Sequence, residues 1–83
     1  MEKFIQISRY LSPDGVTTYY VIEKTKNSST VLWYGTNKQS AYQVAYRKGR
    51  SLSIPLYAVL YEMTKDENGV SQIIPIGNEV LEN

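Results

Sequence analysis

Residues 3–24 have the sequence KFIQISRYL-SPDG-VTTYYVIEK, and the rest of the chain is best interpreted outward from them. β-branched and aromatic residues, which favour strands, flank the SPDG segment at 12–15. Pro at the second position of that segment and Gly at the fourth suit a type I turn. The pattern predicts an antiparallel hairpin of strands 3–10 and 16–24, with Ile5 and Ile7 on one face and Phe4 and Tyr10 on the other.

Three further strands are predicted. Residues 30–34 form a short strand that ends at Gly35, and sequential strands usually pair, so a three-stranded meander follows. Residues 56–65 are apolar on both faces over their first half, which is typical of a central strand. Residues 70–76 return after a turn, and Pro75 places them at a sheet edge because proline donates no ladder hydrogen bond. From about residue 77 the chain is predicted to be a polar tail.

One helix is predicted over residues 37–48, which lack Pro and Gly. Thr36 is the expected N-cap, with Gln39 as its capping-box partner. Gly49 is the expected C-cap. Small apolar residues at Ala41 and Ala45 would allow the helix to approach a sheet closely.

The predicted fold is therefore a single α+β domain, residues 1–83, of order β-β-β-α-β-β, with an antiparallel sheet and one helix packed on one face. One helix cannot cover five strands. We expect either a sheet that curls strongly around the helix or an apolar patch that stays uncovered.

The composition excludes most catalytic chemistry. The chain has no Cys and no His, so it lacks thiolate ligands, a cysteine nucleophile and an imidazole base. Its five glycines are isolated, and no carboxylate pair lies next to a nucleophile. We predict no enzymatic activity, no cofactor and no metal. No signal-like start and no apolar run of membrane length occur, so we expect a cytoplasmic protein that makes no membrane contact.

Tyrosine is the unusual residue, with eight in 83. Tyr, Trp and Arg dominate the energetics of protein interfaces, and Tyr offers a large contact area at low entropic cost. Adjacent strand residues point to opposite faces, so tyrosines must lie on both sides of the sheet. We predict a protein-binding surface that contains Tyr20, Trp33, Tyr34, Tyr42 and Tyr46.

Charge is distributed unevenly along the chain. The net charge is only +1, but residues 24–61 contain six basic residues and no acidic one. Aromatic residues are interleaved with these cations, which suits phosphate contacts and base stacking. Nucleic-acid binding through segment 24–50 is therefore the alternative function, with Lys38, Arg47, Lys48 and Arg50 as its contacts. The pI of about 7.9 is low for a dedicated nucleic-acid domain.

Small size, the absence of catalytic groups and an aromatic surface together suggest an inhibitor or accessory protein that acts by steric occlusion. Viruses and mobile elements encode many proteins of this class, so we expect such an origin. The expected partner is a protein, with a host nucleic-acid-handling enzyme and a second copy of the chain as the two candidates.

Overall fold

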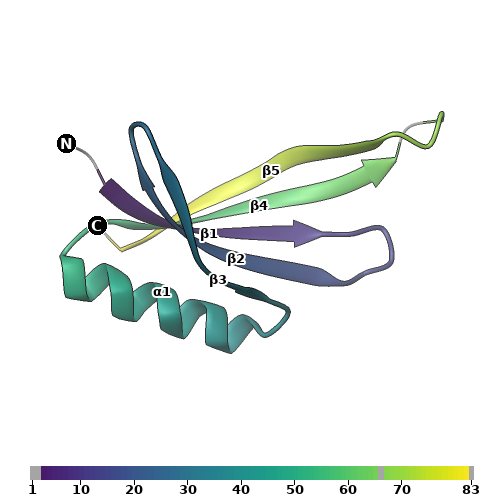
Figure 1. Cartoon of the computed structure of the whole chain (residues 1–83). Helices are drawn as coiled ribbons and strands as arrows, with labels where there is room; N and C mark the ends of the chain where they lie inside the picture. The colour runs from purple at the N-terminus through teal and green to yellow at the C-terminus, as the bar shows by residue number, and fades with distance from the viewer. Residues whose placement is uncertain (1–2, 66, 83) are drawn as a thin grey trace.

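The computed structural model of the chain describes residues 3–65 and 67–82 (Figure 1). Its elements are β1 (Lys3–Leu11), β2 (Thr17–Thr25), β3 (Ser29–Gly35), α1 (Lys38–Leu52), β4 (Leu56–Lys65) and β5 (Ser71–Glu82). The strands form one sheet of order β3-β2-β1-β4-β5. The element order, the β1–β2–β3 meander and the interior position of β4 are confirmed.

The sheet is mixed, and the prediction of a purely antiparallel sheet is wrong in one place. β4 runs parallel to β1, with Ile5 opposite Leu56 and Ile7 opposite Ala58. The other three strand pairs are antiparallel. The cause is α1, which carries the chain from β3 across the sheet to the far side of β1; a parallel pairing needs such a crossover.

The C-terminal strand is longer than predicted. Residues 77–82, expected to be a polar tail, continue β5 and pair with the first half of β4. Backbone pairing with an apolar neighbour holds a polar segment in a strand, where local composition predicts none. β5 lies at the sheet edge, as Pro75 predicts, and the register shifts between Leu60 and Tyr61, next to the proline.

The first hairpin is formed as predicted. The Gly15 N–H donates to the Ser12 carbonyl at 3.0 Å, and Gly15 has a φ of +89°, a conformation that favours glycine. The Asp14 carboxylate accepts from the Ser12 hydroxyl and from the Val16 N–H. These two hydrogen bonds hold the pKa of Asp14 below its usual value.

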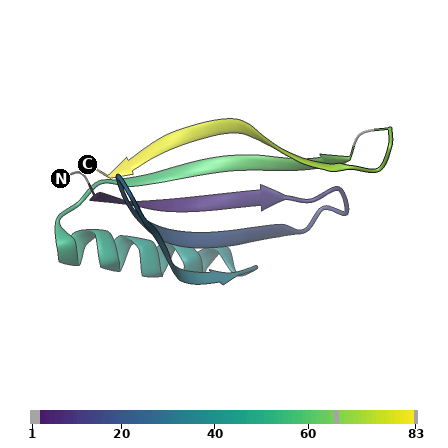
Figure 2. The same cartoon turned by 45° about the horizontal axis from the view of Figure 1, so that its top comes forward.

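The core lies between α1 and one face of the sheet. Its buried hydrophobic residues come from β1, β2, α1 and β4: Ile5, Ile7, Tyr19, Val21, Ala41, Ala45, Leu56 and Ala58. Ala41 and Ala45 are fully buried, so the small side chains on α1 do allow a close approach to the sheet. Figures 1 and 2 show α1 along this one side, while the β4–β5 hairpin projects beyond it.

Both ends of the helix differ from the prediction. Asn37, not Thr36, is the N-cap: its Oδ1 accepts from the Ser40 N–H at 2.9 Å. The helix continues through Gly49 to Leu52, and the C-cap is Ser53 in the left-handed conformation. Gly49 is buried, and the Ile54 N–H donates to its carbonyl at 3.0 Å. Gly49 is therefore a buried residue inside the last helical turn and does not terminate the helix.

Replacing Asn37 with alanine is expected to lower the free energy of unfolding by about 1 kcal/mol, because the Ser40 N–H loses its acceptor. Urea unfolding measures the change. Thr36→Ala is the matched control and should alter stability by less than about 0.5 kcal/mol. A larger loss from Thr36→Ala than from Asn37→Ala would contradict this assignment of the cap.

Candidate binding surfaces

The side of the sheet opposite α1 carries an aromatic and aliphatic surface, which we call the helix-free face. The strand registers place residues from all five strands on it. Its aromatic members are Phe4, Tyr10, Tyr20, Tyr34, Tyr57 and Tyr61, and its aliphatic members include Ile22, Val31, Val59, Met63, Ile73 and Val80. Among the described strand residues, the charged side chains on this face are Lys24 and Lys65, which lie near opposite ends of the sheet.

Four of these tyrosines form a continuous row across four adjacent strands, which we call the tyrosine row. Tyr34 of β3 stacks on Tyr20 of β2, with ring centroids 5.9 Å apart. Tyr20 meets Tyr10 of β1 edge to face at 5.4 Å, and Tyr10 stacks on Tyr61 of β4 at 4.9 Å. These distances and angles are those of favourable aromatic pairs. The rings therefore support one another and present a preorganised surface.

Two polar side chains lie beneath the aromatic rings at the middle of this face. Gln6 and Ser8 are both buried, and the Gln6 Nε2 donates to the Ser8 Oγ at 2.8 Å. Burial raises the pKa of the Tyr10 hydroxyl above its usual value, although a hydrogen bond with Ser8 acts in the opposite direction. The tyrosines Tyr61 and Tyr20 beside it raise the pKa of Tyr10 further.

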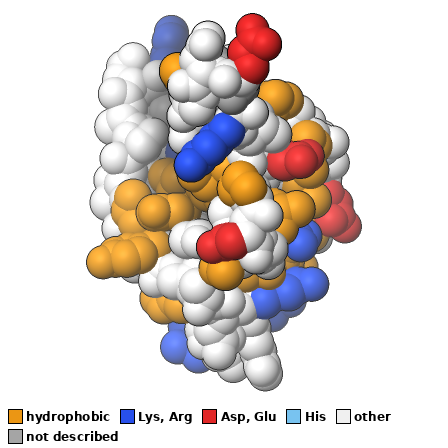
Figure 3. Space-filling view, turned by 90° about the vertical axis from the view of Figure 1, so that its right-hand side faces the viewer, with side chains coloured by type: hydrophobic (Ala, Val, Ile, Leu, Met, Phe, Trp, Pro, Cys, Tyr) orange, Lys and Arg blue, Asp and Glu red, His pale blue; other side chains and the backbone are white. Residues whose placement is uncertain are grey.

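A hollow of about 440 Å³ opens on the helix-free face beside the tyrosine row. It is lined by Tyr10, Thr18, Tyr20, Ile22, Met63 and Ile73. Tyr34, at the end of the row, is 70% exposed. The face therefore has both a depression and a projecting ring. Seen from the ends of the hairpins, hydrophobic side chains gather in patches between scattered acidic and basic ones (Figure 3).

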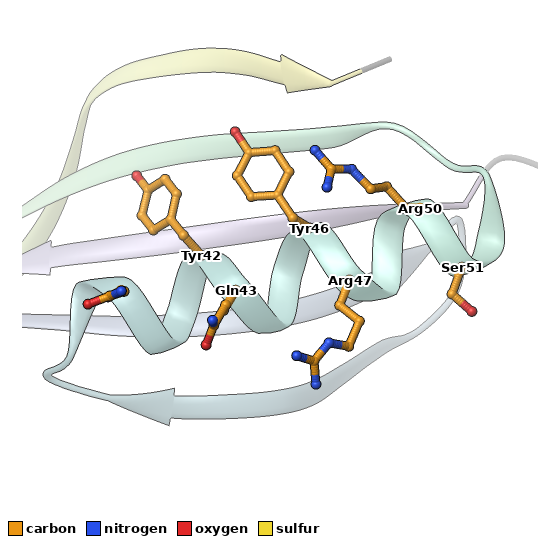
Figure 4. A pocket seen from close by; sticks show the side chains of 7 residues that line it. Tyr42, Gln43, Tyr46, Arg47, Arg50 and Ser51 are labelled. Carbon is orange, nitrogen blue, oxygen red and sulfur yellow. The ribbon is translucent and has the colours of Figure 1, made fainter.

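The helix side carries a different surface, an open groove of about 790 Å³ along α1 (Figure 4). Seven helical residues line it: Gln39, Tyr42, Gln43, Tyr46, Arg47, Arg50 and Ser51. The rings of Tyr42 and Tyr46 point to the same side of the helix, with centroids 6.5 Å apart, whereas Gln43 and Arg47 point to the other side.

Cations lie over tyrosine rings on the helix side. Lys38 Nζ is 5.7 Å from the Tyr42 centroid, and the Arg50 guanidinium is 5.2 Å from that of Tyr46. A third pair joins Arg9 of β1 to Tyr19 at 5.7 Å. Proteins contain about one such pair per 70–80 residues, so three among the described residues make this side rich in cation–π contacts.

The structure separates the residues that the sequence groups into one protein-binding surface. Tyr20 and Tyr34 lie on the helix-free face, Tyr42 and Tyr46 on the helix side. Trp33 packs against the core, and a Cβ at Gly35 would lie 3.0 Å from its ring, so glycine there makes room for the indole.

The four residues of the nucleic-acid alternative are also divided. Lys38 and Arg50 lie over the groove tyrosines. Arg47 lines both the groove and a second hollow on the opposite flank of α1, where Lys48 is found with Leu32 and Val44. The helix therefore distributes these cations around its exposed surface instead of presenting them as one patch.

Sequence reasoning missed the half of the tyrosine row that lies on β1 and β4. Tyr10 and Tyr61 are not in the predicted site, and neither are Phe4 and Tyr57, which meet edge to face at 5.3 Å. A signal was present, since Tyr57 and Tyr61 alternate with core residues along their strand. Their neighbours across the β1–β4 pair depend on a parallel pairing that local sequence does not reveal.

Two other features are absent from the described residues. Within 3–65 and 67–82, no three His, Cys, Asp or Glu side chains come together as a metal site. In the same part of the chain, no helix has the length and apolarity needed to cross a bilayer.

Comparison with known proteins assigns no family: no protein-family model, no curated protein and no solved structure matches the chain.

The raised pKa of Tyr10 predicts a loss of stability at alkaline pH. The folded state favours the neutral hydroxyl of Tyr10. The contribution of this preference to the free energy of unfolding is complete below the ordinary tyrosine pKa of about 10 and is lost as the pH rises through the raised value. Tyr10→Phe should weaken this alkaline loss, measured by urea unfolding at neutral and alkaline pH. Identical pH profiles for the two proteins would contradict the partial burial of Tyr10 as the cause of its raised pKa.

Proposed function

We propose that the chain is a small, non-enzymatic protein-binding module that recognises its partner through the helix-free face. The observation that carries this proposal is the tyrosine row, in which Tyr34, Tyr20, Tyr10 and Tyr61 support one another across four strands. Tyrosine side chains contribute strongly to protein interfaces because each provides a large apolar ring with a polar end. A row already held in place loses little conformational entropy on binding.

The exposure of the surrounding aliphatic residues supports the same proposal. Val31, Ile73 and Val80 lie on this face and are each more than half exposed. Large contiguous apolar patches are uncommon on monomeric proteins and mark interaction sites. A module that binds in this way acts by covering its partner's surface, as an inhibitor or accessory protein does.

The test is capture by an affinity-tagged chain from nuclease-treated extract of cells that also express an untagged copy. We expect a discrete protein, foreign or the untagged copy, to be retained. Tyr20→Arg should abolish retention, because it places a charge inside the tyrosine row. Tyr46→Ala, on the helix side, is the matched control and should retain the same protein.

Circular dichroism must show that Tyr20→Arg remains folded. Tyr61→Arg, at the β4 end of the row, provides an independent variant. Retention that survives both folded variants, or retention lost only with Tyr46→Ala, would overturn the proposal that the helix-free face binds the partner.

Nucleic-acid binding along the groove of α1 is a second candidate function, favoured by the cation–π pairs at Tyr42 and Tyr46. Single-stranded nucleic acids bind to aromatic rings that stack with bases and to cations that contact phosphates. The helix-free face is a poor candidate for this role, because its charged side chains in the described strands are limited to Lys24 and Lys65.

This second candidate predicts salt-dependent binding of a labelled single-stranded oligonucleotide, measured by fluorescence anisotropy. Affinity should fall steeply as salt rises, and Lys38→Glu should weaken binding because it reverses a charge beside Tyr42. Lys65→Glu, a charge reversal of equal size far from α1, is the control. Binding that does not change with salt, or that both variants affect equally, would exclude the groove as a nucleic-acid site.

A further inference from the structure

We infer that the protein that covers the helix-free face is a second copy of the chain, in a two-fold symmetric homodimer in which Tyr34 of each copy enters the hollow of the other. This inference rests on the proposed function, since it names the partner of the same surface.

The charge of the face favours a second copy. In a two-fold interface each residue meets a different residue of the partner, except close to the symmetry axis, and a charge buried there without an opposite charge destabilises the contact. On the helix-free face, the described strand residues place charge only at Lys24 and Lys65, near the ends. Other charged residues of the same strands occupy the alternate positions, which face the helix side: Arg9, Glu23, Glu62 and Glu79. Two copies can therefore meet over the tyrosine row without burying a charged side chain of these strands at its centre.

The area of the face is also sufficient. Five strands spaced about 4.8 Å apart, with about nine residues each at about 3.3 Å per residue, present on the order of 700 Å². Two such faces bury roughly 1,400 Å², which lies within the range of stable protein interfaces. Sheets that pack face to face at an angle of about 30° form a common two-layer arrangement.

The shape of the face provides complementarity. Tyr34 is the most exposed of the large hydrophobic side chains described, and it stacks on Tyr20, which lines the hollow. In a two-fold dimer every contact occurs twice with the roles exchanged. A projecting ring and a hollow large enough to receive it, both on one face, are the two elements that such an interface requires.

A dimer would also add buried apolar surface to a protein whose own core is small. Among the described residues, eight hydrophobic side chains are buried between α1 and the sheet, and chains of this length bury a low fraction of their surface. A second sheet packed on the helix-free face would add Val31, Ile73 and Val80 to the buried apolar surface, and the dimer would then be more stable than the monomer at any concentration that populates it.

Sedimentation equilibrium of the purified chain over a range of concentrations tests the inference. The mass should rise from the monomer value of 9.5 kDa toward twice that value, and the melting temperature should rise with protein concentration. Tyr34→Ala should weaken the dimer by roughly 30-fold or more, the effect of removing an interface hot spot. Because Tyr34 is largely exposed, the variant monomer should keep its circular dichroism spectrum.

Tyr46→Ala is the control for loss of a tyrosine on the helix side and should dimerise as the unmodified chain does. Tyr20→Arg is a second disrupting variant within the row. A mass of 9.5 kDa at every concentration would overturn the inference. A dimer that survives both Tyr34→Ala and Tyr20→Arg would also overturn it, by placing the contact elsewhere, such as the β5 edge.

The outcome also separates the inference from the proposed function. A monomeric chain that captures a foreign protein in a Tyr20-dependent manner would refute the homodimer and retain the protein-binding face. A monomeric chain that captures nothing would refute both.

Discussion

The return of the chain through α1 is the constraint on which the rest of the structure depends. A helix of 15 residues, at about 1.5 Å per residue, is about as long as a strand of seven, the length of β3. α1 therefore brings the chain back to the end of the sheet where β3 begins, and β4 must run in the direction of β3. β1 has that same direction, because two antiparallel pairings separate it from β3. The parallel pairing of β1 with β4 follows.

The same connection leaves one face of the sheet uncovered. A helix is about 10 Å wide, and strands are spaced at about 4.8 Å, so α1 lies mainly over two strands, β1 and β2, on one side of the sheet. Ala41, Ala45 and Gly49 bring it close to the centre of the sheet, where it buries Ile7 and Val21. Along each strand, the side chains that alternate with the core residues then lie on the helix-free face. Most of these side chains are tyrosines and aliphatic residues.

Local features could be predicted from the sequence, and features that depend on distant pairing could not. The first hairpin, the edge position of β5 and the opposite directions of Tyr19 and Tyr20 follow from turn residues, Pro75 and strand alternation. The contact of Tyr10 with Tyr61 requires the β1–β4 register, and residues 77–82 become a strand only because β4 is available to pair with them. Thr36 and Asn37 are both good caps, so their choice depends on where packing begins the helix.

The two sides of the sheet therefore differ in chemistry, and only one of them is covered by the helix. On the helix side, Lys38 and Arg50 lie over tyrosines, whereas the tyrosine row has no cation at its centre among the described residues. The polar atoms beneath the row belong to Gln6 and Ser8, which are hydrogen-bonded to each other and already buried. Covering the row thus removes little additional water from these two side chains, and the polar groups that a partner meets on the row itself are the tyrosine hydroxyls. A partner that covers the row meets apolar rings and their hydroxyls, with no charged side chain of the described strands at the centre, and this is the reason for proposing association with a protein there instead of binding of a charged ligand.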